Sequence, residues 1–176
     1  CLTYRLGHWL WCYSGPLLPV AIALRIPFIF WNRFVEIITG ISITPRAEIG
    51  PGLYIRHFGG IIVGEGVVLG ENCNLSQGVT IGISGRGEKR GSPCIGDRAY
   101  VAAGAKVFGK ISLGHDVAIG ANAVVSRSLP DRTVAVGIPA EVISYKGSFD
   151  YVLYRTMATD PVRLHSLSQA DPQEDI

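Results

Sequence analysis

The chain has 176 residues and a mass of 18.9 kDa, the size of a single domain with its own core. Charged residues make up 17% of the chain and hydrophobic residues 48%, a balance that excludes an intrinsically disordered protein. Lys and Arg number 16 against 14 Asp and Glu, so the formal net charge is only +2 and we expect no nucleic-acid partner.

The numbers and spacing of cysteine and glycine narrow the class of protein further. The four cysteines, Cys1, Cys12, Cys73 and Cys94, show neither CxxC spacing nor the density of a disulfide-stabilised secreted domain. We therefore predict reduced thiols in a cytoplasmic protein. Glycine, at 22 residues, is enriched without a collagen period, which indicates that many backbone positions need it.

The first forty residues are apolar. Residues 7–24 carry no Asp, Glu, Lys or Arg and approach the length of a membrane span. Polar residues and prolines interrupt this run at His8, Ser14, Pro16 and Pro19. We favour short apolar helices over residues 1–40, packed on the main domain or resting on a membrane surface, over a true span. Three arginines in this segment agree with peripheral association at the inner face of the membrane: Arg5, Arg25 and Arg33.

From residue 43 onward, aliphatic residues return every six positions. They fall in three in-phase blocks: Ile43, Ile49 and Ile55; Val63, Leu69, Leu75 and Ile81; Ile95, Val101, Val107, Leu113, Ile119 and Val125. Small or aliphatic residues lie four positions later, among them Val67, Cys73, Val79, Ala99, Ala105, Val117 and Ala123. A period of six fits neither a helix nor a hairpin sheet, but it fits a parallel β-helix in which three hexapeptides make one coil. Cys73 is then a core residue and not a reactive thiol.

Two steps of the repeat are longer than six residues. Eight residues separate Ile55 from Val63, and fourteen separate Ile81 from Ile95. The second step predicts an extruded loop over residues 83–94, which is rich in glycine and basic residues. Loops that leave a rigid solenoid often carry function, so we expect the site near these two interruptions.

The repeats fade after Pro130. We divide the chain into an apolar helical segment (1–40), a β-helix domain (41–145) and a C-terminal extension (146–176). From about residue 159 the polar sequence predicts a frayed tail.

Few residues of the solenoid can do acid–base chemistry. His8 and His165 lie outside it, which leaves too few histidines for a three-histidine zinc site, and we expect no metal. His115 sits in an unbroken repeat and is predicted to be a surface residue. His57 falls where the register slips, beside Gly59 and Gly60, and an exposed imidazole there is a suitable general base. The sequence has no GxSxG elbow, no GxxxxGK[ST] loop and no GxGxxG that opens a helix.

From about Tyr4 to Ile143 the chain resembles the left-handed parallel β-helix, or hexapeptide-repeat, acyltransferases, and among them it is most similar to serine acetyltransferases. The fold implied is a mainly β, left-handed parallel β-helix preceded by a short helical segment. The resemblance rests on these segments: Tyr4–Trp11 (YRLGHWLW), Ile41–Gly50 (ISITPRAEIG), Gly60–Glu65 (GIIVGE), Leu75–Gly82 (LSQGVTIG), Ala103–Ala105 (AGA) and Val136–Ala140 (VGIPA).

The resemblance implies an acetyl-CoA-dependent acetyltransferase that acts by direct transfer, as a homotrimer with sites between subunits. His57 falls on the family's catalytic histidine and would take the proton from the acceptor hydroxyl. The expected contacts of acetyl-CoA, a cosubstrate, are Gly82, Ser84, Ala103 and Ala121, with Arg127, Arg132 and Lys146 near its phosphates.

The chain departs from the family at residues associated with the amino-acid acceptor. Ser42 replaces an aspartate that orients the histidine, Arg56 replaces an aspartate just before it, and Gly91–Ser92 replaces an Arg–His pair. The predicted acceptor contacts are Arg56, Glu65, Gln77, Ser92 and Ser42, with Ser42 and Glu65 also considered for orienting His57. Lost charged hydrogen bonds weaken serine binding, so we expect a sugar hydroxyl in polysaccharide or capsule biosynthesis as acceptor. The alternatives are L-serine O-acetylation in cysteine biosynthesis and a non-catalytic trimeric scaffold.

Overall fold

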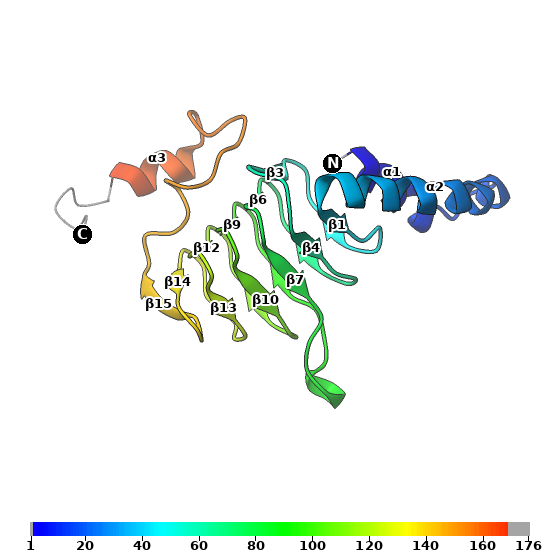
Figure 1. Ribbon diagram of the computed structural model, residues 1–176. Coiled ribbons are helices and arrows are strands. Elements are labelled where there is room, and N and C mark those ends of the chain that lie inside the picture. The colour runs from blue at the N-terminus through cyan, green and yellow to red at the C-terminus, as the bar shows by residue number, and fades with distance from the viewer. Residues whose placement is uncertain (1, 169–176) are drawn as a thin grey trace.

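A computed structural model describes residues 2–168 and shows a pair of helices followed by a stacked β-solenoid (Figure 1). The helices are α1 (Leu2–Cys12) and α2 (Leu18–Thr39), and a third, α3 (Pro161–Ser168), lies near the C-terminus. The chain forms the predicted left-handed parallel β-helix, so the fold prediction is confirmed.

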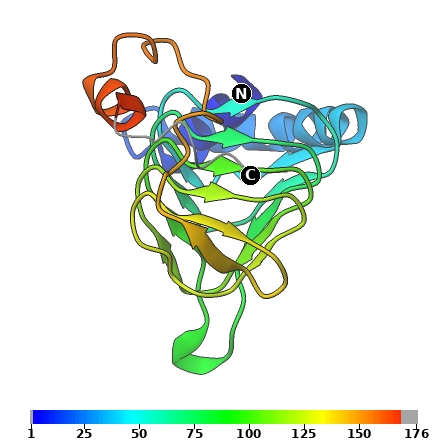
Figure 2. The same cartoon turned by 90° about the vertical axis from the view of Figure 1, so that its left-hand side faces the viewer.

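Three sheets form the sides of the solenoid, and the view along the coils shows how they stack (Figure 2). Sheet A holds β1 (Ile41–Ile43), β4 (Ile61–Val63), β7 (Thr80–Gly82), β10 (Lys106–Phe108) and β13 (Val124–Val125). Sheet B holds β2 (Glu48–Ile49), β5 (Val68–Leu69), β8 (Cys94–Ile95) and β11 (Ser112–Leu113). Sheet C holds β3 (Tyr54–Ile55), β6 (Asn74–Leu75), β9 (Tyr100–Val101), β12 (Ala118–Ile119), β14 (Val134–Val136) and β15 (Glu141–Ser144). We call the turns between them the AB, BC and CA corners.

The strand register shows where the hexapeptide period is broken. In sheet A, Val107 pairs with Val125 and Val63 with Ile81, steps of 18 residues, or three hexapeptides. Ile43 pairs with Val63 over 20 residues, because two extra residues lie at the CA corner that carries His57. Ile81 pairs with Val107 over 26 residues, because eight extra residues form the loop at the AB corner.

The core is the stack of inward aliphatic side chains that the period predicts. Twelve of the thirteen repeat positions are buried, and Ile55, in the first coil, is half-buried. The residues four positions later are buried as well, Cys73 among them. Burial of these side chains is the main stabilising contribution to each coil.

The N-terminal helices are attached to the first coil by polar contacts. The Tyr4 hydroxyl donates to the carbonyl of Ala47 at 2.7 Å, and the Arg5 guanidinium donates to the carbonyls of Ile49 and Gly50. The expectation of short helices is wrong for α2, which runs for 22 residues. Pro19 lies in the first turn, where a missing N–H leaves no helical hydrogen bond unmade, and the helix continues through Pro27 in its interior.

Residues 145–160, which we call the C-terminal strap, cross the outer face of sheet C. The Asn74 side chain donates to the carbonyl of Leu153 at 3.2 Å and accepts from its N–H at 3.0 Å. Tyr151 stacks on Tyr100 with ring centroids 5.3 Å apart, and Phe149 of the strap is buried. The strap thus closes one of the three outer faces.

The expectation of a frayed tail from about residue 159 is wrong for part of that segment. α3 spans Pro161–Ser168, and Asp160 Oδ1 accepts the N–H of Val162 at 2.9 Å at its start. Asp160 also accepts a hydrogen bond from the hydroxyl of Tyr154. Burial of the hydroxyl and, second, this bond raise the pKa of Tyr154 to about 12. Residues 169–176 lie outside the described part of the chain.

We expect Ile81→Ala to lower the free energy of unfolding by about 2–5 kcal/mol, because its side chain is fully buried between neighbouring coils. Ile143→Ala, at an exposed position of β15, is the matched control and is expected to cost less than about 1 kcal/mol. Denaturant unfolding of both variants measures the difference. Equal losses would contradict the assigned core.

Cys73 should resist alkylation in the native protein. Burial raises the pKa of its thiol to about 11, whereas Cys12 and Cys94 are exposed. Iodoacetamide at neutral pH is expected to modify Cys12 and Cys94 and to spare Cys73 until the chain is denatured, as read by peptide mass spectrometry. Early native labelling of Cys73 would argue against its place in the core.

Candidate active site

His57 is presented on a two-residue bulge at the CA corner of the first coil. The preceding strand is paired up to Arg56, whose N–H donates to the carbonyl of Leu75 at 3.2 Å. His57 and Phe58 then turn outward and are exposed. Gly59 and Gly60 follow with φ angles of 100° and 66°, which returns the chain to sheet A.

The backbone of this turn is held on both sides. The N–H of Gly78, in the next coil, donates to the carbonyl of Gly59 at 2.9 Å. On the other side, the N–H of Ile61 donates to the carbonyl of Gly40, the C-cap of α2. A Cβ atom on Gly40 would lie 3.0 Å from the Cα of Gly59, so the end of the helix lies directly against the turn.

The imidazole of His57 is open to solvent. Within residues 2–168 it makes no hydrogen bond and no ion pair. A histidine with a fixed backbone and a free ring can accept a proton from a bound hydroxyl, as the sequence predicts. His115 has a different environment, because its Nδ1 lies 3.1 Å from Asp97 Oδ2 and accepts the N–H of Asp97.

Ser42 and Glu65 do not contact His57 within the protomer. The Ser42 hydroxyl points outward from β1 and donates to Glu36 Oε1 at 3.0 Å. Glu65 accepts from the guanidinium of Arg46 at 2.8 Å and lies at the AB corner. Within the described part of this chain, no contact therefore supports the expectation that Ser42 or Glu65 orients His57.

Glu36, the hydrogen-bond partner of the predicted site residue Ser42, is a polar residue that the sequence analysis missed. Its carboxylate accepts hydrogen bonds from Asn32, Arg33 and Ser42. These residues line a cavity of about 290 Å³ between the helices and the first coil. Glu36 is the first acidic residue of the chain and the only one before Glu48. An isolated carboxylate in an apolar segment is the sequence signal that could have identified it.

The predicted site residues divide between corners of the solenoid. Arg56 and His57 lie at the CA corner, where Gln77, Ala103 and Ala121 follow in the next three coils, since β3, β6, β9 and β12 pair in register. The carbonyl of Gln77 accepts the N–H of Gly104, and that of Ala103 accepts the N–H of Asn122. At the AB corner lie Gly82, Ser84, Ser92 and Arg127, with the extruded loop (Figure 1). Sheet A separates the two groups.

The extruded loop is anchored at its base. Ser84 and Gly91 form an antiparallel bridge, and the Ser92 hydroxyl donates to the carbonyl of Glu65 at 2.6 Å. The loop contains a short 3₁₀ turn at Gly87–Lys89 and is exposed over residues 83–90, whereas Pro93 at its base is buried. A Cβ atom added to Gly82, just before it, would meet nothing within 4 Å, so this edge has room for a ligand.

Two predicted phosphate contacts lie elsewhere. Arg132 is at the BC corner with its guanidinium over the ring of Phe149, and one of its buried nitrogens has no hydrogen-bond partner among the described atoms. Lys146 begins the strap beside Gly147, whose added Cβ would lie 3.0 Å from the carbonyl oxygen of Asp116. Neither residue is close in the fold to the loop or to His57, and their roles stay predictions.

The known proteins with similar sequences are serine acetyltransferases. A serine acetyltransferase of Mycobacterium tuberculosis is 40% identical over 155 residues, which cover 85% of this chain and 64% of that protein. A serine acetyltransferase of Helicobacter pylori is 41% identical over 143 residues, covering 81% of this chain and 78% of that protein. No family model matches the sequence.

Solved structures agree with these relatives. The crystal structure of a serine acetyltransferase from Brucella abortus in complex with coenzyme A matches with a TM-score of 0.70 and 31% identity. A serine acetyltransferase from Neisseria gonorrhoeae in complex with serine matches with a TM-score of 0.68. Each match covers 81% of this chain, which spans only 54% of either protein.

The turn that presents His57 yields a stability prediction. Gly60 has a positive φ, and an added Cβ would approach the Cα of Gly78 to 3.3 Å. Gly60→Ala should destabilise the protein by more than the roughly 1–2 kcal/mol of the left-handed backbone alone. Gly87→Ala, also at positive φ but with open space around it, isolates that backbone cost. Equal shifts of the unfolding midpoint would show that the turn is not packed against the next coil.

Proposed function

The chain belongs to the serine acetyltransferase family, and from this premise we propose that it transfers the acetyl group of acetyl-CoA to the hydroxyl of L-serine. The observation that carries the proposal is the exposed His57 on a turn clamped between α2 and the second coil. A general base needs this combination of a fixed backbone and an accessible ring.

His57 performs two proton transfers in the proposed reaction. It first removes the proton from the acceptor hydroxyl, so that the oxygen attacks the thioester carbonyl of acetyl-CoA. Backbone N–H groups stabilise the oxyanion of the tetrahedral intermediate. The imidazolium then returns its proton to the departing thiolate of coenzyme A. No acyl-enzyme is formed, and no charge is left on the protein.

The described residues fit a bound pantetheine arm. The open space beside Gly82 leaves room along the edge of sheet A, and Ala103 and Ala121 are small residues at the CA corner. Arg127 is exposed at the AB corner, near the level of the last coils, where a cation can meet phosphates. These positions make acetyl-CoA the proposed cosubstrate.

The relatives support L-serine, the alternative acceptor of the sequence analysis, over the sugar hydroxyl that it favoured. The cavity that Glu36 lines also supplies a carboxylate for an ammonium group, although the family's aspartates are replaced. Arg56, exposed beside His57, supplies a cation for a carboxylate group.

A sugar hydroxyl is the second candidate acceptor. The observation that favours it is the state of Glu36, whose carboxylate already accepts from Asn32, Arg33 and Ser42. An ammonium group would have to displace one of these donors, whereas a sugar hydroxyl needs no carboxylate partner. The exposed loop leaves this side of the solenoid open to a large acceptor.

We also propose that the active protein is a homotrimer. Three predicted acetyl-CoA contacts, Gly82, Ser84 and Arg127, lie at the AB corner, and sheet A separates them from His57 at the CA corner of the same protomer. A neighbouring copy that brings its AB corner to this CA corner would unite them. The strap occupies the outer face of sheet C, so the faces of sheets A and B are those left for neighbours.

The first test is thiol release from acetyl-CoA with L-serine as acceptor. His57→Ala is expected to lower turnover by about a hundredfold or more, because the general base is lost. His115→Ala, the other solenoid histidine, is the matched control and should stay within about twofold.

The same assay with hexose acceptors separates the two candidate functions. Turnover with a sugar but not with serine, dependent on His57, would replace the proposal by the second candidate. No turnover with any acceptor, combined with no binding of acetyl-CoA, would indicate a non-catalytic scaffold.

A further inference from the structure

The long helix α2 has its polar side chains, except that of Arg33, turned toward the protein. Arg25 donates to the carbonyls of Leu10 and Trp11 in α1, and its guanidinium lies over the Trp11 ring. Asn32 donates to Glu36, which accepts from Ser42 of the first coil. Its two buried hydrophobic residues, Ala21 and Phe28, lie on this same inward side.

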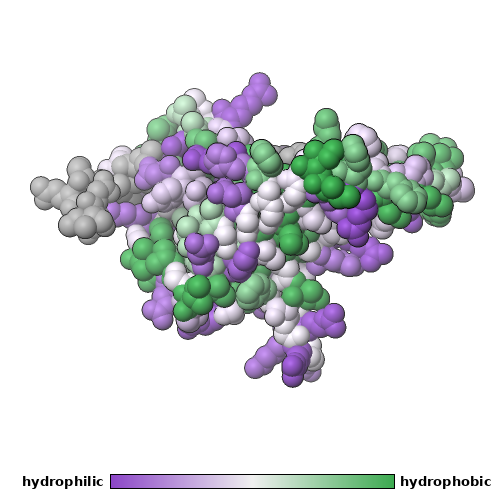
Figure 3. All heavy atoms as spheres, viewed as in Figure 1, coloured by the Kyte–Doolittle hydropathy of each residue, from purple (hydrophilic) through white to green (hydrophobic). Residues whose placement is uncertain are grey.

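The rest of the helix surface is apolar and exposed. At about 100° per residue, the exposed side chains cover an arc of about 220° around the axis. They are Val20, Ile22, Leu24, Ile26, Ile29, Phe30, Trp31, Phe34, Ile37 and Ile38. Phe30 is 73% exposed and Ile37 82%. Figure 3 shows hydrophobic side chains gathered over the helical end of the molecule.

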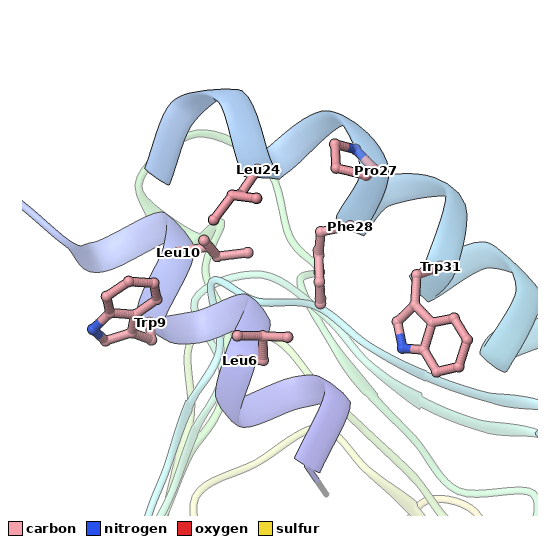
Figure 4. A pocket seen from close by; sticks show the side chains of 7 residues that line it. All are labelled: Leu6, Trp9, Leu10, Leu24, Pro27, Phe28 and Trp31. Atoms are coloured by element: carbon pink, nitrogen blue, oxygen red, sulfur yellow. The ribbon is translucent and has the colours of Figure 1, made fainter. Parts of the chain in front are cut away.

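An apolar groove continues this surface between the two helices. It has a volume of about 380 Å³ and is lined by seven residues: Leu6, Trp9, Leu10, Leu24, Pro27, Phe28 and Trp31 (Figure 4). Trp9 and Trp31 lie on either side of it and are about half exposed. Groove and outer arc together form one apolar surface, which we call the hairpin face.

We propose that the hairpin face binds the surface of a lipid bilayer, with α1 and α2 lying in the membrane interface. A partner helix covers a stripe of roughly 100°, whereas the exposed arc of α2 is about twice as wide. Lipid chains can cover such an arc, because they contact every side chain that faces them. α2 is the one helix among residues 2–168 that is long and apolar enough to cross a membrane, with a mean hydropathy of 1.4 over its best window.

The attachments of the helices decide between lying on the bilayer and spanning it. Tyr4 of α1 is hydrogen-bonded to Ala47 of the first coil and Gly40 after α2 to Ile61 of the second, so the hairpin leaves the solenoid and returns to it. From its attachment at Tyr4, α1 runs only to Cys12, about 12 Å at 1.5 Å per residue, which is less than half the hydrocarbon thickness. The hairpin therefore stays on the solenoid's side of the bilayer.

Charge agrees with a membrane of net negative surface. Residues 2–40 contain three arginines and one glutamate, a net charge of +2. Arg33 is the one charge on the outer arc, and its long side chain can reach the headgroups while the stem stays among apolar neighbours. The main contribution is hydrophobic, so binding should persist at high salt.

Vesicle flotation tests the proposal with a matched pair of variants. The wild-type protein is expected to float with phosphatidylethanolamine–phosphatidylglycerol vesicles. Ile26→Glu with Phe30→Glu on the outer arc should lower the partition coefficient by at least about tenfold. Ile143→Glu with Val162→Glu changes two exposed apolar residues, in β15 and α3, at the opposite end of the molecule from α1 and α2 (Figure 1), and should leave it within about twofold.

The tryptophans give a readout that needs no variant. All three, Trp9, Trp11 and Trp31, lie in α1 and α2. Quenching of wild-type fluorescence by brominated phospholipids is therefore expected on vesicle binding.

Three results would overturn the proposal. One is wild-type protein that stays out of the floated fraction and is not quenched. Another is a larger assembly in solution that the helix variant dissolves while no vesicles are bound, which would make a second copy the occupant. The last is binding that the helix variant retains and that high salt abolishes, which would place it on another, charged surface.

Discussion

Every coil of this protein has to turn three corners and return to lie directly on the coil before it. The corners do this with left-handed backbone at repeated positions: Gly60, Gly78, Gly104 and Asn122 at the CA corner, and Asn72, Arg98, Asp116 and Arg132 at the BC corner. Non-glycine residues in this conformation cost free energy, which the continuous inward stack of aliphatic side chains offsets. Extra residues fit only where they leave the stack, at a corner.

The two places where residues are added both flank sheet A, and this arrangement gives the solenoid its functional side. The two-residue bulge brings His57 out at one edge, and the eight-residue excursion brings the basic loop out at the other. The end of α2 lies against the bulge through Gly40, so the hairpin face and the histidine turn are neighbours in the fold. A protein bound to a bilayer through these helices would hold this corner close to the lipid headgroups.

The sequence predicts the features of the fold that repeat along the chain, and it misses the contacts that occur only once. Ile81 and its counterparts recur at a fixed spacing, so their burial follows from local pattern, and the slip near His57 is visible as a break in it. The bond between Ser42 and Glu36 depends on how a helix packs on a coil, which no period encodes. The length of α2 was missed because Pro19 resembles an interruption, and the prediction of a frayed tail from about residue 159 failed for residues 161–168, which form α3 after Asp160.

The strap changes how such a stack can come apart. Coils that touch only their neighbours can peel away one at a time from a free end, with little cooperativity. Here the bonds between Asn74 and Leu153 join residues 79 apart, linking the second coil to the chain beyond the last one. Ser148 adds a bond to the carbonyl of Arg98 in between. The last coils cannot fray independently while these bonds hold, so the strap makes the unfolding of several coils a single event.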